Sequence, residues 1–302
     1  MTTQTGRVPV EPASDLPDDK WTVQVGRSAV EALDRAQPLI AADAVRHSVF
    51  ATVTAALVDE PERHKDPCWF FLGRGRGVDA VAMHTPPQAL HVSTHVPGAT
   101  QELATFVAET AQPIPGVGGD RAAVEAFLDR YTAITGRTGF AVEGKGVFDL
   151  PSEPELSRAV PGDYLVAGED HLGLATAWVR AFKADIGTPC DGTERSLVGR
   201  HIAAGRLGLW LANGVPVAMC WASTSHAGVV RISGVYTPSE LRGHGYASAV
   251  VCAASRRQQD LGHRCMLYTQ LSNPTSNKIY QAMGYRRVGD DLQVQFDAPE
   301  AR

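Results

Sequence analysis

The sequence predicts a mixed α/β protein built from two similar halves. Its 302 residues exceed one average domain and fit two domains of about 150 residues each. Both halves show the order helix, hairpin, strand, helix, read from the spacing of apolar residues. The pair Asn213-Gly214 separates two apolar runs and favours a two-residue hairpin turn, because both positions tolerate positive φ. Together these observations indicate a diverged internal duplication.

The first half, residues 1–150, contains three segments with the apolar spacing of a helix and several short apolar runs. The last helix is followed by Gly136, a typical C-terminal cap. We expect helices over 42–58, 99–111 and 120–135, two strands with a glycine-rich connection in 68–85, and a strand in 88–96. Residues 1–20 are rich in Pro and Asp and predict a flexible arm.

The second half, residues 151–302, begins in a segment whose three prolines interrupt any regular pattern between 149 and 164. Its first expected helix again ends on a glycine, Gly187. We expect helices over 172–187, 247–261 and 274–284, a hairpin in 206–223, and strands over 228–237, 264–271 and 292–296.

Composition narrows the class of protein. Hydrophobic residues make up 44% and charged residues 20% of the chain, and the net charge is -5, which argues against a nucleic-acid surface built on bulk positive charge. Without an apolar run of about 20 residues or a secretory leader, a cytoplasmic protein that does not bind membranes is expected. The five cysteines form no CxxC pair and none lies beside a histidine at metal-ligand spacing, so we expect reduced thiols and no metal site. They are Cys68, Cys190, Cys220, Cys252 and Cys265.

A glycine-rich turn joins the strand at 228–237 to the helix at 247–261. Its sequence is Arg242-Gly243-His244-Gly245. Glycines at a helix start leave several N–H groups unpaired at the positive end of the helix dipole, which suits a phosphate or pyrophosphate. By itself the pattern also fits a structural tight turn with an exposed arginine. It is neither a P-loop nor the dinucleotide fingerprint, because Ser248 stands where that fingerprint has its third glycine.

Two stretches resemble the motifs of one superfamily. Arg242-x-x-Gly245-x-Ala247 resembles motif A of the GNAT N-acetyltransferases, and "SNPTSNKIYQAMGYRRVG" resembles their motif B. The second stretch matches at Asn273, Ile279, Tyr280, Gly284 and Tyr285, with Ser276 where the motif has Ala. The resemblance covers about 155–297, and the first half resembles at most a degenerate copy. It implies two tandem domains, each a central mixed, mostly antiparallel sheet flanked by helices.

The resemblance also implies an activity and a site. A GNAT protein transfers the acetyl group of acetyl-CoA to an amine, and the cofactor would lie along the strand at 228–237 and on the glycine-rich turn. Tyr280 would be the general acid that stabilises or protonates the departing thiolate. The residues implied in cofactor binding are Val235, Tyr236, Thr237, Arg242, Gly243, His244, Gly245, Tyr246, Ala247, Ser248, Asn273 and Asn277.

The general base and the acceptor stay open. The strand segment 229–232 contains no carboxylate, and we name no base from the remaining acidic residues and histidines. The expected acceptor is a small-molecule primary amine, taken by a monomer or homodimer. Three alternatives remain: a protein or peptide N-acetyltransferase, a non-catalytic acyl-CoA-binding sensor, and a phosphate-binding domain for another nucleotide. The sensor would keep the pyrophosphate turn and have no use for Tyr280.

Overall fold

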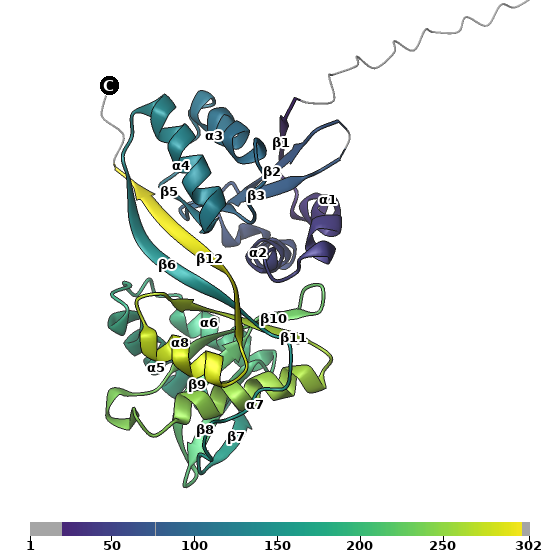
Figure 1. The fold of residues 1–302 in the computed structure, drawn as a ribbon. Helices are drawn as coiled ribbons and strands as arrows, with labels where there is room; N and C mark the ends of the chain where they lie inside the picture. Colours follow the sequence, from purple (N-terminus) through teal and green to yellow (C-terminus); the bar gives the residue numbers. More distant parts are fainter. Residues whose placement is uncertain (1–19, 76, 298–302) are drawn as a thin grey trace, which may run out of the picture.

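The computed structural model describes residues 20–75 and 77–297, so the predicted flexible arm lies almost wholly outside the described residues. Over these residues twelve strands form one continuous sheet with helices on both faces (Figure 1). The mixed α/β class predicted from the sequence is confirmed. The first repeat contains β1 (Thr22–Gly26), α1 (Ala29–Ala42), α2 (Ser48–Asp59), β2 (Cys68–Gly73), β3 (Ala80–His84), β4 (Leu90–Val92), α3 (Ala99–Glu109), β5 (Gly116–Asp120), α4 (Arg121–Thr135) and β6 (Gly139–Leu150). The second contains β7 (Asp163–Val166), α5 (Leu172–Asp185), α6 (Glu194–Ala203), β8 (Leu207–Ala212), β9 (Val215–Ala222), β10 (Val229–Tyr236), α7 (Tyr246–Asp260), β11 (Arg264–Gln270), α8 (Pro274–Ala282) and β12 (Arg286–Phe296).

The two repeats follow the same plan and exchange their last strands. The strand order is β1-β2-β3-β4-β5-β12-β6-β11-β10-β9-β8-β7, which reads the same from either end when each strand of one repeat is replaced by its counterpart in the other. In Figure 1, β6 and β12 run side by side between the upper and lower halves. Each therefore fills a place in the other repeat's sheet: β12 pairs with β5, and β6 pairs with β11. The domain boundary after residue 150, predicted from the sequence, stays a proposal; it falls at Leu150, the last residue of β6.

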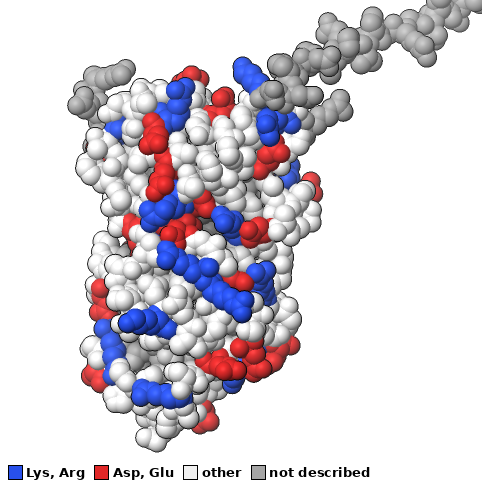
Figure 2. Space-filling model, viewed as in Figure 1, with Lys and Arg blue, Asp and Glu red and all other residues white. Residues whose placement is uncertain are grey.

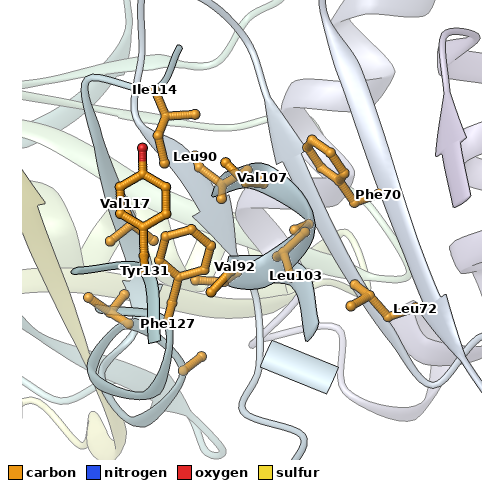
Figure 3. Packing of buried hydrophobic residues seen from close by; sticks show 14 of the residues in the cluster. Phe70, Leu72, Leu90, Val92, Leu103, Val107, Ile114, Val117, Phe127 and Tyr131 are labelled. Atoms are coloured by element: carbon orange, nitrogen blue, oxygen red, sulfur yellow. The ribbon is translucent and has the colours of Figure 1, made fainter. Parts of the chain in front are cut away.

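Apolar clusters cover both faces of the sheet in each repeat. One cluster packs α3 and α4 onto the first repeat, and part of it, including Phe70, Leu103 and Tyr131, is shown in Figure 3. A matching cluster packs α7 and α8 onto the second repeat. On the opposite face, α1 and α2 cover the first repeat and α5 and α6 cover the second. This burial supplies most of the driving force for folding.

The predicted helices and strands are present, and three differ clearly in extent. The strand expected in 88–96 is only β4, Leu90–Val92. The helix expected over 42–58 begins at Ser48, because Asp43 ends α1 and residues 44–47 form a turn. The strand expected over 292–296 is the second part of the longer β12. Both positions of the Asn213-Gly214 turn have positive φ, as the sequence predicts.

Several elements are not visible in the local pattern: β1, α1, β5, β6, β7 and α6. Two of them are strands rich in glycine, which lowers intrinsic strand propensity. In β5 the missing side chains at Gly116 and Gly119 leave room for the main chains of β12 and β4. In β6, Gly146 leaves room for the ring of Phe148. Neighbouring strands, rather than local sequence, therefore decide that these segments are extended.

Charges of both signs are interspersed on the face drawn in Figure 2. None of the helices within the described ranges has the length and apolarity that crossing a bilayer requires. Across the same ranges, no cluster of three or more His, Cys, Asp or Glu side chains is arranged to hold a metal ion.

Candidate functional site

The parallel strands β10 and β11 separate part of the way along their length. They pair from Val229 with Arg264 to Ile232 with Leu267. Beyond that point β10 continues to pair with β9 through an irregular step, whereas β11 continues to pair with β6 as far as Gln270. The step contains Gly234, whose φ is +61° and whose missing side chain leaves the space filled by the ring of Trp221. A gap thus opens in the sheet beyond Ile232 and Leu267.

The glycine-rich turn follows the free end of β10. Gly243 and Gly245 have φ of +84° and +88°, and Gly245 is the N-cap of α7. Within the described part of the chain, the amide N–H groups from Gly243 to Ser248 donate to no protein acceptor. Because these amides lie at the positive end of a 15-residue helix, the turn is suited to bind a phosphate or pyrophosphate.

Two arginines lie at this turn, the predicted Arg242 and the unpredicted Arg158. Arg242 points away from the turn, because its Nε donates to the carbonyl oxygen of Thr237 at 3.0 Å and its guanidinium pairs with Asp185 on α5. Instead, Nη2 of Arg158 donates to the carbonyl oxygen of Gly243 at 3.1 Å. Arg158 is exposed and forms no ion pair with a described carboxylate. It lies 85 residues earlier in an irregular segment, so no local signal could have linked it to the turn.

Other predicted side chains near the turn have structural contacts. The side chain of Tyr236 is buried and packs against Trp178 with ring centroids 6.1 Å apart. The exposed ring of His244 stacks on Tyr246 at 5.5 Å. At these positions the site is therefore formed by main-chain groups rather than by the side chain of Tyr236.

Two buried polar atoms near the gap lack a hydrogen-bond partner among the described residues. One is Oγ1 of Thr237 just beyond β10, and the other is Oδ1 of Asn277 on α8. Nδ2 of Asn277 donates to the carbonyl oxygen of Gln270 at 3.2 Å, which holds the amide near the end of β11. Asn273, by contrast, uses its side chain to cap α8 by accepting from the amide of Ser276 at 3.0 Å. Asn277 is thus the better placed of the two predicted asparagines, since a buried unpaired acceptor favours a donor from a ligand.

Tyr280 lies on α8 within the cluster that joins α7 and α8 to the sheet. Its side chain is 9% exposed, and its ring packs edge-on against Tyr285 with centroids 6.0 Å apart. Burial, together with the nearby Cys220, raises the pKa of the Tyr280 phenol above its ordinary value. The phenol therefore stays protonated at neutral pH and is able to donate a hydrogen bond.

The first repeat has a counterpart of this turn, but it is closed. Gly98, with φ of +85°, caps α3 as Gly245 caps α7. The ring of Trp21 occupies the position that a β-carbon on Gly98 would take. The amide of Gly98 donates to Oε1 of Gln101 at 3.0 Å, and the next amide donates to the carbonyl oxygen of Val96 at 3.1 Å. The first repeat therefore lacks the open amides of the second.

A cavity of about 300 Å³ lies between the repeats. Both repeats contribute to its wall, including His91 and Gly118 from the first and Arg231 and Tyr268 from the second. A cleft for the acceptor between the two halves was expected from the sequence, but its lining residues were not, because they come from strands and a helix far apart in the chain.

Comparisons with known proteins agree with this architecture. Residues 207–294 match the model of a family described as FR47-like protein. A GNAT-family acetyltransferase from Colwellia psychrerythraea has a similar structure, with a TM-score of 0.58, 14% identity, and coverage of 91% of this chain and 100% of that chain. A GCN5-related N-acetyltransferase from Sphaerobacter thermophilus has a TM-score of 0.59 and 16% identity, and the match covers 91% of this chain and 95% of that chain. A Drosophila protein has a TM-score of 0.61 and 10% identity, and the match covers 92% of this chain and 99% of that protein. No curated protein matches the chain by sequence.

The similarity of fold extends over both repeats, whereas the family match is confined to the second repeat. Each of these three structures covers more than nine-tenths of this chain, so the shared fold includes both repeats. The family model matches the segment from β8 to β12, which contains the separated strands and the open turn. The fold is the one that GNAT acetyltransferases have, as the resemblance of the two sequence motifs implied.

Proposed function

We propose that this protein is an acetyl-CoA-dependent N-acetyltransferase whose active site is the gap between β10 and β11, and that its acceptor is a primary amine of a small molecule. The observation that carries the proposal is the row of open amides from Gly243 to Ser248 beside a gap walled by two unpaired polar atoms. A diphosphate with an amide-containing arm matches both features.

The residues present fit acetyl-CoA. The amides from Gly243 to Ser248 would hold its pyrophosphate, with Arg158 adding a charge-assisted contact in place of Arg242. The free edge of β10 at Val235 and Thr237 would pair with the amides of its pantetheine arm, as an added strand does. On the opposite wall, Oδ1 of Asn277 is available as an acceptor.

The chemistry follows from the thioester. The nitrogen of a neutral amine forms a bond to the thioester carbonyl carbon, and the carbon–sulfur bond then breaks. The proton lost from nitrogen goes to water or to a base that we do not name, and the electron pair of the broken bond remains on sulfur. Because burial raises the pKa of Tyr280, its O–H serves mainly as a hydrogen-bond donor to the departing sulfur. Removing such a group costs roughly 10²- to 10⁴-fold in rate.

The test measures acetyl transfer and cofactor binding separately. A panel of amines is incubated with acetyl-CoA, and acetylated products are detected by mass and thiol release. Tyr280→Phe should lower kcat with unchanged acetyl-CoA affinity. The matched control Tyr285→Phe changes a neighbouring buried phenol, which bonds Ser255 at 2.8 Å, and should retain kcat.

A second pair of variants tests the turn. Gly245→Glu should abolish acetyl-CoA binding, since the added side chain meets Val160 and places a carboxylate at the open amides. Gly136→Glu is the matched control: Gly136 also has positive φ but lies in open space at the end of α4. Tight binding of acetyl-CoA with no acetylated product from any amine would favour the sensor alternative, and normal acetyl-CoA binding by Gly245→Glu would contradict the proposed site.

A cytoplasmic location and a monomeric or homodimeric state remain predictions from the sequence.

A further inference from the structure

The cavity between the repeats adjoins the gap on the face opposite α7 and α8. Along β10, Val230 and Ile232 point into the cluster under α7 and α8, so Arg231 between them points to the other face. On β11, Tyr268 directly follows Leu267, the last residue paired with β10. Both Arg231 and Tyr268 line the cavity. A molecule held there would therefore reach the start of the gap without crossing the helices that flank the proposed acetyl-CoA site.

Arg231 is a cation without an acidic partner among the described residues. Its guanidinium lies near two neutral hydroxyls of α2, with Nη1 3.3 Å from Oγ of Ser48 and Nη2 3.5 Å from Oγ1 of Thr52. Burial lowers the pKa of Arg231, which still leaves the guanidinium charged. A buried charge without a counter-ion is unfavourable, and an anionic ligand would offset that cost.

Among the ionisable groups that line the cavity, Arg231 is the one available to pair with an anionic ligand. The second cation, Lys145, already pairs with Glu143 at 2.6 Å. Burial, with smaller contributions from His47 and Arg231, lowers the pKa of His91 to about 4, so this histidine is neutral. Glu143 and Asp291 place acidic groups on the central strands, while Arg231 lies toward α2. The cavity thus has Arg231 on its α2 side, and the carboxyl groups of Glu143 and Asp291, with Lys145 beside them, on the central strands. The guanidinium is available to an anionic group, and a carboxyl group is available to an amine.

We propose that this cavity binds the acceptor and that Arg231 pairs with an anionic group on it, so that the substrates are small amines that also carry a carboxylate or a phosphate. This inference rests on the proposed acetyltransferase function and narrows its acceptor class. The ligand nitrogen then lies toward Tyr268 and the gap, and the anionic group lies toward α2. A neutral amine would leave the guanidinium unpaired and bind more weakly.

The test compares amines that differ only in the anionic group. The probes are the proteinogenic L-amino acids against their C-terminal amides, and phosphoethanolamine against ethanolamine. With wild-type protein and acetyl-CoA, kcat/KM should be about 10- to 100-fold higher for the anionic member of the productive pair. The two series distinguish a carboxylate from a phosphate, and this comparison needs no variant.

Variants then assign the effect to the guanidinium. Arg231→Gln should reduce kcat/KM for the anionic member to the level of the neutral one, leave the neutral one and the acetyl-CoA dissociation constant unchanged, and be partly rescued by Arg231→Lys. Arg286→Gln, at an exposed arginine of β12, is the matched control and should keep the preference. An equal loss for both members, or a wild-type enzyme that accepts neutral amines equally well, would overturn the inference. If no probe is acetylated, binding of the probes decides the question.

Calorimetric titration separates failure of this inference from failure of the proposed function. The same probes are titrated into the protein without acetyl-CoA, and acetyl-CoA is titrated in a separate experiment. If acetyl-CoA fails to bind, the proposed function fails. Preference of the apoprotein for the anionic probe, lost in Arg231→Gln, still supports the Arg231 contact, and the absence of any preference contradicts it.

Discussion

The surroundings of Asp291 on β12 disfavour the ionised form of its carboxyl group. It lies directly opposite Asp120 on β5 and opposite Lys145 on β6. Burial first, and Asp120 second, raise the pKa of Asp291 to about 6 from an ordinary value of 3.8, although Lys145 and Arg46 oppose the change. A like charge facing it across antiparallel strands adds to the cost of ionisation. The stability of the protein should therefore depend on the charge of this one carboxyl.

The sign and size of the pH dependence of the free energy of unfolding follow from the linkage between proton binding and folding. Between pH 4 and 6 the unfolded chain has lost the proton of Asp291 while the folded protein still holds it, so the free energy of unfolding falls as pH rises through this window. A difference of about 2 in pKa corresponds to about 3 kcal/mol. Asp291→Asn removes the charge, so it should raise the free energy of unfolding by about 1 to 3 kcal/mol at pH 7 and by almost nothing at pH 4.

The assay is urea unfolding at pH 4, 5, 6 and 7, followed by circular dichroism. Asp129→Asn, at an exposed position of α4, is the matched control and should shift the free energy by no more than about 0.5 kcal/mol at any pH. Carbon NMR of the side-chain carboxyl gives the pKa of Asp291 directly. An effect of Asp291→Asn that is the same at pH 4 and pH 7, or a loss of stability at pH 7, would refute the reasoning.

Two further substitutions test the gap and the turn. Gly234→Ala should destabilise the protein by about 3 kcal/mol, because a side chain there has positive φ and overlaps the ring of Trp221. Gly136 also has positive φ but is surrounded by open space, so Gly136→Ala should lower the free energy of unfolding by only about 1 kcal/mol. If both substitutions lower stability equally in thermal unfolding, overlap with the ring of Trp221 is not the cause. Arg158→Gln should weaken acetyl-CoA binding by about 2- to 5-fold at low salt, as expected for an exposed charge, and less at high salt. Calorimetry at two salt concentrations measures this, and a loss independent of salt would contradict an electrostatic contact.

Local sequence was sufficient for the features that depend on neighbouring residues. The Asn213-Gly214 turn, the glycines before α7 and the helix carrying Tyr280 were all predicted, because positive φ, capping and helical spacing are decided within a few residues. The repeated order of elements likewise predicted two similar halves, and the resemblance of the two motifs implied the GNAT-type fold. Of the proposed site, the local pattern predicted the open amides of the glycine-rich turn, and the resemblance to motif B indicated Tyr280.

Tertiary structure alone decided how the repeats are joined and which distant side chains meet. The exchange of β6 and β12 depends on pairing between residues such as Asp149 and Arg286, and glycine-rich strands carry little local signal for it. Arg158 reaches the turn, and Arg231 reaches α2, only because strands and loops far apart in the chain are folded together. Burial raises the pKa of Asp291, and packing leaves Arg231 without an acidic partner among the described residues. Burial is a property of the packed molecule rather than of any short segment.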